Sequence, residues 1–417
     1  MKPQTMDPLK SKTTATQTET KPHLLSGLRI LDIGTMVSGP VACTLFGDFG
    51  ADVIKVEVPE RGDTVRDIGP YVDDVCLYWS VENRNKRSIT LDLRTPKGRE
   101  LLLKLLPEVD AVVENFRPGT LERWGLSYDT MKEHNPNLIL LRISGFGQTG
   151  PYRERAGYDR IALAFGGVMG ITGFPDRPPV KIGTSVADYQ TALLGAFSLM
   201  MAIYHRDMHN GGGQEIDLAM YESIARFTDV LIPTYDRLGV ARQRRGNTHF
   251  ASAPGEHFLT SDGRYIILTI SANAGFERLC HAMHRPEWLN DPRFVSHESR
   301  WEHVDVLNKA VAEWILSKPI EEICRILDEA KLAYSFIYSV ADMMTDPHYL
   351  ARGTITSVND PKIGPIKMTG VIPRFSNVES KEIAPAPELG DSNEDIYGKL
   401  LGLSNEEIET LRREKVI

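Results

Sequence analysis

The sequence has little cysteine, and the cysteines it has are widely separated. Only four occur in 417 residues, and no two of them form a C-x-x-C pair. This usage excludes a disulfide framework and a structural zinc site, and it fits a reducing, cytoplasmic environment. The four are Cys43, Cys76, Cys280 and Cys324.

Several other signals are absent. No apolar run reaches the roughly 20 residues that a spanning helix needs, so we do not expect an integral membrane protein. The net charge of −8 is spread along the chain, which leaves no basic patch for nucleic acid or for an acidic membrane surface. Neither G-x-S-x-G nor H-E-x-x-H occurs, so neither a serine-hydrolase elbow nor a zinc-protease helix is indicated.

The order of apolar segments predicts an α/β protein. Residues 1–24 are rich in Thr, Lys and Gln, lack an apolar core and predict a disordered tail and not a signal peptide. After them, short apolar runs alternate with stretches of helical composition, the pattern of a doubly wound, mostly parallel sheet. The expected strands are 28–34, 51–57, 88–93, 111–116 and 138–144, with helices over 40–50 and 96–108.

The second half of the chain changes texture. Residues 188–207 are apolar nearly all round and predict a long buried helix, and 221–239 predict another single helix. A hairpin is expected around Asp262-Gly263, followed by further helices. We therefore expect a large domain over 25–224 and a smaller α+β domain over 225–330.

A literal G-x-G-x-x-G occupies residues 145–150, directly after an expected strand. For a dinucleotide site this motif should open a helix, but Pro151 and a charged stretch follow it. A structural turn and a ligand loop both remain open. An NAD site at 32–40, with Glu57 as the ribose-binding acid, has the wrong glycine spacing.

Asp188 stands just before the long apolar helix. It could cap that helix, because a carboxylate accepts backbone N–H bonds there and is favoured by the helix dipole. It could instead be a nucleophile that attacks an activated acyl carbon. The residues around it do not decide between the two roles.

Five long motifs, taken together, resemble CoA-transferase family III. They are "LSGLRILDIGTMVSGPVACTLFGDFGADVIKVEVPERGD", "NRNKRSITLDLRTPKGRELLLKLL", "VVENFRPGTLERWGL", "ISGFGQTGPYRERAGYD" and "VADYQTALLGA". The resemblance runs from about Leu25 to the C-terminus. Within the family, the chain is most similar to transferases that use succinyl-CoA with a small dicarboxylic acid such as malate or citramalate.

The resemblance implies how such an enzyme works. It places the family's catalytic aspartate at Asp188, which would form an aspartyl–acyl anhydride and then an aspartyl-CoA thioester. An aspartate is ordinarily ionised at neutral pH and needs no general base. No prosthetic group or metal is implied, since the CoA thioester is itself a substrate. The resemblance also implies that residues 331–417 return to the large domain. An interlocked homodimer is implied, and a similar second subunit is a further option.

The family pattern also implies which residues contact CoA. Arginines suit a ligand with three phosphates, because guanidinium pairs bidentately with phosphate oxygens. Backbone N–H groups near Val37 and Ser38 are expected to stabilise the oxyanion. The implied contacts are Val37, Ser38, Leu91, Arg94, Asn115, Phe116, Arg117, Arg123, Tyr158 and Asp159.

Two features depart from the formyl-CoA branch of the family. Val37 stands where that branch has Gln, and "RRGNTHFASAPG" stands where it has a run of glycines. Arg245 or His249 in that stretch is a candidate partner for the acceptor's distal carboxylate. An acyl-CoA racemase of the same fold, a transferase for another acid (glutarate, itaconate, benzylsuccinate or carnitine type), an NAD-dependent oxidoreductase and a CoA-binding partner subunit are the alternatives.

Overall fold

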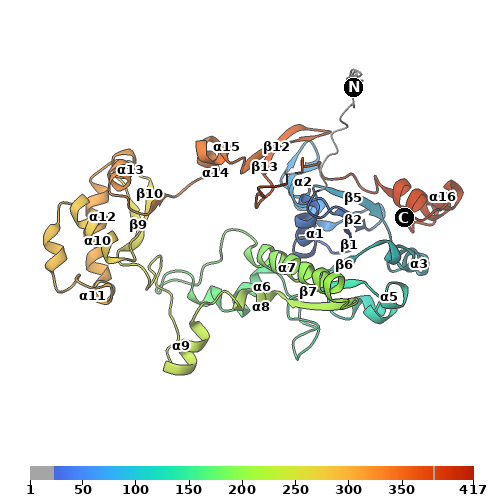
Figure 1. Cartoon of the computed structure of the whole chain (residues 1–417), viewed down its shortest axis with the longest axis horizontal. Helices are drawn as coiled ribbons and strands as arrows, with labels where there is room; N and C mark the ends of the chain where they lie inside the picture. The colour runs from blue at the N-terminus through green and yellow to red at the C-terminus, as the bar shows by residue number, and fades with distance from the viewer. Residues whose placement is uncertain (1–22, 379–380) are drawn as a thin grey trace, which may run out of the picture.

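Residues 23–378 and 381–417 are described by a computed structural model. A six-stranded sheet forms its centre, in the order β5-β2-β1-β6-β7-β8, and every neighbouring pair is parallel (Figure 1). Chain order reverses between β1 and β6. The strands are β1 (Arg29–Asp32), β2 (Asp52–Glu57), β5 (Lys86–Thr90), β6 (Ala111–Glu114), β7 (Ile139–Ser144) and β8 (Gln214–Ala219).

Both faces of the four central strands, β2, β1, β6 and β7, are buried, which is why these strands read as mainly apolar runs. Leu31, Ile54, Val112 and Leu140 are in register and point to one face, against α3 (Pro96–Leu105) and α5 (Tyr128–His134). The alternate residues, such as Val53 and Leu141, point to the other face. There they meet α1 (Ser38–Asp48) and α7 (Val186–His209).

The end of the chain packs beside the edge strand β5. Asn393 Oδ1 accepts from the backbone N–H of Thr90 at 2.9 Å, and the Tyr397 hydroxyl donates to the Thr90 carbonyl at 2.7 Å. Ile396 and Ile408 enter the same core as α3, Ile408 from α16 (Asn405–Arg413). Ser404 and Glu407 form the capping box at the start of α16.

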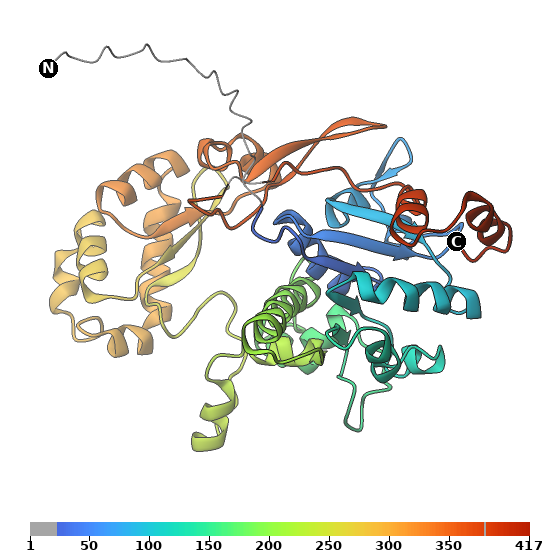
Figure 2. The ribbon, with the colours of Figure 1, turned by 45° about the vertical axis from the view of Figure 1, so that its right-hand side comes forward.

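A smaller sheet lies to one side of the parallel sheet and has its own core (Figure 2). Its strand order is β11-β10-β9, all antiparallel, and the predicted hairpin joins β9 and β10. The strands are β9 (Gly255–Leu259), β10 (Tyr265–Thr269) and β11 (Tyr334–Phe336), with α10 (Asn273–Ala282), α12 (Val304–Leu316) and α13 (Ile320–Glu329) packed on them. A separate hairpin, β12 (Ile355–Asp360) with β13 (Gly364–Thr369), follows.

Three expectations about helices were wrong. Residues 221–239 form two helices, α8 (Met220–Ala225) and α9 (Leu231–Leu238), with a break between them. Helix α7 is buried on one face only, because it packs on the sheet and α1 but leaves an apolar stripe outside. By length and composition alone, α7 is long and apolar enough to cross a membrane, so the expectation that no segment would be was wrong. A helix that packs in a protein core can have the same length and composition.

The four cysteines are free, and only Cys324 is not fully buried. Most of the predicted tail, residues 1–22, lies outside the described part of the chain.

Candidate active site

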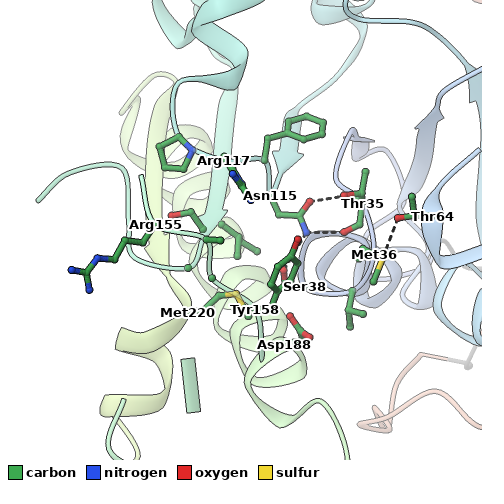
Figure 3. A pocket seen from close by; sticks show the side chains of 18 residues that line it. Thr35, Met36, Ser38, Thr64, Asn115, Arg117, Arg155, Tyr158, Asp188 and Met220 are labelled. Carbon is green, nitrogen blue, oxygen red and sulfur yellow. Dashed lines mark hydrogen bonds between the residues drawn. The ribbon is translucent and has the colours of Figure 1, made fainter. Parts of the chain in front are cut away.

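A pocket of about 380 Å³ opens at the carboxyl ends of β1, β6 and β7 (Figure 3). Chain order in the sheet reverses between β1 and β6, and open α/β sheets bind their ligands at such a point. The turn after β1, the loop after β6 and the start of α7 all contribute walls. The lining residues are Thr35, Met36, Val37, Ser38, Thr64, Asn115, Phe116, Arg117, Pro118, Ile143, Ser144, Gly145, Arg155, Ala156, Gly157, Tyr158, Asp188 and Met220.

The turn after β1 is fixed from the loop after β6. Asn115 Oδ1 accepts from the N–H of Thr35, and Asn115 Nδ2 donates to the carbonyl of Thr35, both at 2.7 Å (Figure 3). The same amide nitrogen reaches Ser38 Oγ at 3.3 Å. The Asn115 side chain therefore fixes the position of the turn relative to the end of β6.

The first turn of α1 presents unpaired N–H groups to the pocket. Within the described residues, no acceptor is found for the N–H groups of Val37, Ser38 and Gly39. Val37 precedes the helix, and no side chain caps it. A helix start with free donors stabilises negative charge, whether as a bound anion or as charge that develops during a reaction.

Asp188 lies in the first turn of α7, half-buried, with its carboxylate on the pocket wall. Burial, and then the charge of Asp159, raise its pKa to about 7, against a smaller lowering effect of Lys181. The expectation that this carboxylate would be fully ionised at neutral pH was therefore wrong. A carboxylate with a raised pKa is more basic, and once ionised it is therefore a stronger nucleophile.

Asp159, and not Asp188, binds the start of α7. Helix α7 begins after Ser185, so Asp188 is inside it and makes no capping bond. Asp159 Oδ1 instead accepts from the N–H of Ala187 at 2.8 Å, and Lys181 Nζ lies 3.4 Å from its other oxygen. The carboxylate of Asp188 is left free for a ligand.

The neighbouring residue fixes the same turn of α7 from another side. The Tyr189 hydroxyl donates to Glu82 Oε1 at 2.7 Å, and burial raises the pKa of that carboxyl. Tyr189 and Asp159 thus hold the helix start on both sides of Asp188.

The glycines of the 145–150 motif serve the backbone and do not form a dinucleotide loop. A Cβ on Gly145 would come within 2.5 Å of Gly157 Cα, so the backbone segments at these two residues lie too close together to leave room for a side chain. Gly147 and Gly150 adopt φ of 86° and 84°, as tight turns require. Only Gly145 of the three lines the pocket.

The residues expected from sequence divide into three groups. Val37, Ser38, Asn115, Phe116, Arg117, Tyr158 and Asp188 come together around the pocket. Asp159 lies behind it, at the helix start. Leu91 is 1% exposed within the core and does not line the pocket, so its contact with CoA remains a prediction.

Arg94 and Arg123 do not line this pocket. Arg94 forms a two-point ion pair with Asp92, and Arg123 donates to Thr120 Oγ1 at 2.8 Å. Their contact with a longer ligand remains a prediction.

The acceptor-binding candidates also lie elsewhere in this chain. The Arg245 guanidinium lies 4.7 Å from the centre of the Trp301 ring, and His249 Nδ1 accepts from the N–H of Ala251. Neither residue lines the pocket. Their role is a prediction that requires another arrangement of this segment or a second chain.

Sequence reasoning missed two cationic groups of the site. Arg155 lines the pocket, with its guanidinium 3.6 Å from the centre of the Tyr152 ring, and Lys181 pairs with Asp159. Arg155 could have been found from the sequence, because it directly precedes the "AGYD" motif, which was expected to contact CoA. Lys181 gave no signal, because only the fold brings it to Asp159.

The carboxylate of Glu57, the candidate ribose-binding acid, is already bound by side chains of this protein. Its carboxylate accepts two bonds from Arg66, at 2.8 and 2.9 Å, and one from Ser88 Oγ at 2.6 Å. It is 3% exposed. These contacts leave no group at the end of β2 to select NAD.

Comparisons with known proteins agree with this geometry. Residues 25–393 match the model of CoA-transferase family III. The chain is 42% identical to a succinyl-CoA–D-citramalate CoA-transferase of Chloroflexus aurantiacus, over 95% of this chain and 98% of the relative. It is 39% identical to the alpha subunit of a succinyl-CoA–L-malate CoA-transferase of the same organism, over 100% and 97%.

A solved structure shares the fold. A CAIB/BAIF family protein from Brucella suis superposes with a TM-score of 0.81 at 34% identity, covering 91% of this chain and 100% of that one.

Proposed function

The chain belongs to CoA-transferase family III, and from that premise we propose that it moves CoA from succinyl-CoA to a small dicarboxylic acid of the malate or citramalate type. The observation that carries the proposal is the placement of Asp188, a half-buried carboxylate facing a pocket beside free N–H groups. The choice of donor and acceptor rests on the two Chloroflexus relatives, whose names state them.

The first half of the reaction leaves CoA on the enzyme. An oxygen of the ionised Asp188 carboxylate attacks the thioester carbon of succinyl-CoA. The C–S bond breaks, CoA leaves as a thiolate, and an aspartyl–succinyl anhydride remains. The thiolate then attacks the Asp188 carbonyl carbon, succinate leaves with its carboxylate restored, and an aspartyl-CoA thioester is formed.

The second half reverses these steps with another acid. The acceptor carboxylate attacks the aspartyl thioester and expels the thiolate, which gives a new anhydride. The thiolate attacks the acceptor's carbonyl in that anhydride, so the product acyl-CoA leaves and Asp188 is a carboxylate again. No proton is gained or lost overall, which suits a pocket whose lining includes no histidine among the described residues.

Each attack creates a negatively charged tetrahedral oxygen. The N–H groups of Val37 and Ser38 are the candidate donors to this oxygen, because both residues line the pocket and their N–H groups have no acceptor in the described residues. Removing one such donor from an acyl-transfer enzyme costs about 10²–10³ in rate. Arg117 and Arg155 at the rim supply positive charge for CoA phosphates.

We propose that the enzyme works as a homodimer, with the two chains interlocked as the resemblance implies. The outer face of α7 exposes an apolar stripe at helical spacing: Leu193, Phe197, Met201, Tyr204 and Met208 are each 50–64% exposed. A contiguous patch of this kind marks an interface. The stripe borders an apolar groove of about 760 Å³ that includes Tyr189 and Gln190, the two residues after Asp188.

A second copy on this face would therefore complete the surroundings of Asp188. A similar but different subunit is the other occupant, as the alpha and beta subunits of the malate relatives suggest.

Activity tests the proposal directly. Purified enzyme with succinyl-CoA should convert L-malate or citramalate to its CoA thioester with release of succinate, and Asp188→Asn should abolish the transfer. Glutarate, itaconate, benzylsuccinate and carnitine complete the acceptor panel. Exchange of α-hydrogens of an acyl-CoA in D₂O, without CoA transfer to any acid, would identify a racemase and overturn the proposal.

A further inference from the structure

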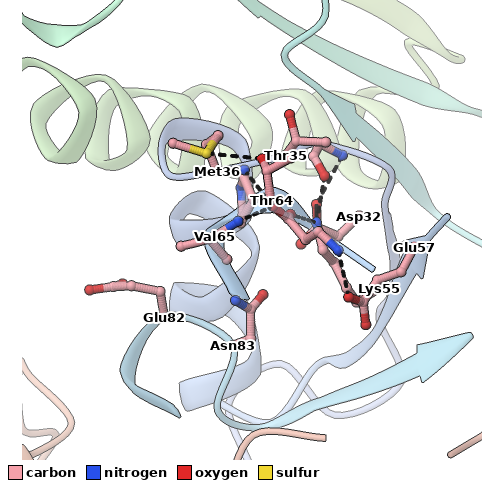
Figure 4. A network of polar contacts seen from close by, with 12 residues as sticks. Asp32, Thr35, Met36, Lys55, Glu57, Thr64, Val65, Glu82 and Asn83 are labelled. Carbon is pink, nitrogen blue, oxygen red and sulfur yellow. Dashed lines mark hydrogen bonds and ion pairs between the residues drawn. The ribbon is translucent and has the colours of Figure 1, made fainter. Parts of the chain in front are cut away.

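Four charged side chains are buried beneath the turn that carries the free N–H groups. We call Asp32, Lys55, Asp63 and Lys86 the buried charge cluster; each is at most 5% exposed (Figure 4). Lys55 Nζ lies 2.8 Å from Asp63 Oδ2 and 3.6 Å from Asp32 Oδ1. Lys86 Nζ lies 2.9 Å from Asp32 Oδ2, so Asp32 joins the two lysines.

Every member of the cluster also binds the backbone of the segment 34–40. Lys55 donates to the carbonyl of Gly34, and Lys86 donates to the carbonyl of Pro40 at 2.7 Å. Asp32 Oδ1 accepts from the N–H of Gly34 at 3.1 Å. Asp63 Oδ1 accepts from the N–H of Met36, also at 3.1 Å.

These bonds lie on both sides of Val37 and Ser38, whose N–H groups have no acceptor in the described residues. The segment is held at Gly34, Met36 and Pro40, and Val37 and Ser38 between them line the pocket. Met36 has a φ of 66°, in the left-handed region that a residue with a side chain rarely adopts. The turn therefore needs outside contacts to keep its shape, and the cluster supplies them.

Stability alone is a poor explanation for such a cluster. Removing charges from water costs several kcal/mol each, and apolar residues of similar volume often replace a buried ion pair without loss. The residues on either side of Lys55 in its strand, Ile54 and Val56, are buried apolar side chains. What apolar residues could not do is bind the backbone groups of Gly34, Met36 and Pro40.

We infer that the buried charge cluster positions the Gly34–Pro40 segment so that its free N–H groups meet the oxyanion of acyl transfer, with Lys55 and Asp63 as positioning residues. This inference rests on the proposed function, because it assumes that an oxyanion forms beside Asp188. The cluster touches no substrate; it acts through the backbone.

Lys55 and Asp63 each favour the charged form of the other. Burial alone would lower the pKa of Lys55, but Asp32 and Asp63 outweigh burial and raise it. Burial would likewise raise the pKa of Asp63, but Lys55 outweighs it and the pKa is lowered. Glu57 also acts on Lys55 in the same direction as the two aspartates.

Two variants and a matched control test the inference. Lys55→Met removes the bond to Gly34, and the milder Asp63→Asn removes the charge beneath Met36. Asp48→Asn breaks another buried pair, Arg84–Asp48 at 2.6 Å, which does not touch the segment. Each protein is measured for melting temperature, for the single-turnover rate of succinate release, and for amide hydrogen exchange at Gly34 and Met36.

We expect Lys55→Met to slow succinate release about 100-fold, as loss of an oxyanion donor does. Asp63→Asn should have a smaller effect in the same direction, and Lys55→Arg should recover part of the rate. Exchange at Gly34 and Met36 should rise at least tenfold in Lys55→Met. The control should lower the melting temperature while rate and exchange stay within twofold of wild type.

Unchanged exchange in both Lys55→Met and Asp63→Asn would overturn the inference, whatever the enzyme's reaction is. A rate loss no larger than in the control at equal folded fraction would also overturn it. A wild-type enzyme that transfers no CoA from succinyl-CoA would instead count against the proposed function, and the exchange measurements would still decide whether the cluster holds the turn.

Discussion

The raised pKa of Asp188 predicts a pH dependence that an ordinary aspartate would not show. The nucleophile must be ionised, and its pKa is about 7. The ionised fraction is then about one tenth at pH 6, half at pH 7 and nine tenths at pH 8, each pH unit corresponding to 1.36 kcal/mol. Transfer should therefore rise about tenfold from pH 6 to pH 8, and it should fall as pH drops through 7. An unperturbed aspartate, at about 3.9, would give a flat profile.

Two neighbours should move this midpoint in opposite directions. Asp159 raises the pKa of Asp188 and Lys181 lowers it. Asp159→Asn should shift the midpoint to lower pH, since the amide oxygen can still accept from Ala187 while the charge is gone. Lys181→Met should shift it to higher pH.

The assay is the initial rate of transfer at low succinyl-CoA, from pH 5.5 to 8.5 at constant ionic strength. The 3′-phosphate of CoA has its second ionisation at about pH 6 and titrates in the same way with every variant, so the shift of the midpoint between wild type and variants reports the enzyme. A flat wild-type profile under conditions where chemistry limits the rate would refute the reasoning. So would a shift of the same sign in both variants.

Three further predictions follow from the same structure. Asp188→Asn should stabilise the protein at pH 8, because the raised pKa makes ionised Asp188 cost up to about 4 kcal/mol of folding free energy above pH 7. The gain should shrink to under about 1 kcal/mol near pH 4, where the folded state is protonated and the unfolded state is about half protonated; thermal melts at both pH values check this. Leu193→Glu on the apolar stripe should halve the mass measured by light scattering and lower activity, whereas the exposed Val306→Glu on α12 should do neither; a dimer that persists in Leu193→Glu contradicts the interface. Arg117→Ala should raise KM for succinyl-CoA tenfold or more, since a charge-assisted bond contributes about 1.5–3 kcal/mol, while the exposed Arg325→Ala should leave it unchanged.

The sequence was sufficient for the central strands of the large sheet because they are buried on both faces. Such strands read as mainly apolar runs, and short helical stretches between them fix parallel connections. The pocket residues were expected from the family resemblance and not from the residues alone. The turn after β1 and the loop after β6 lie at the ends of neighbouring strands, which is why Asn115 and Ser38 meet.

Contacts between distant segments could not be predicted in the same way. The pKa of Asp188 depends on Asp159, and the start of α7 is bound by Asp159 and not by Asp188 itself. The stripe on α7 looked buried because composition does not show which face of a helix the rest of the chain covers. The break between α8 and α9 has no glycine or proline to mark it.

Lys55 did carry a signal that was not used. It interrupts the apolar run "VIKVE" of a strand whose neighbours are all buried. A lysine in a central parallel strand cannot reach water, so it must have buried partners. That argument indicates a buried ion pair, although it does not identify Asp63 or Asp32 as the partners.

Trapping the covalent intermediate tests the central claim most directly. The enzyme is incubated with succinyl-CoA and no acceptor, treated with borohydride or hydroxylamine, digested and mapped by mass spectrometry. The mechanism predicts that Asp188 becomes homoserine with borohydride or a hydroxamate with hydroxylamine, and that neither product forms without succinyl-CoA. An unmodified Asp188 in an enzyme that still transfers CoA would contradict it.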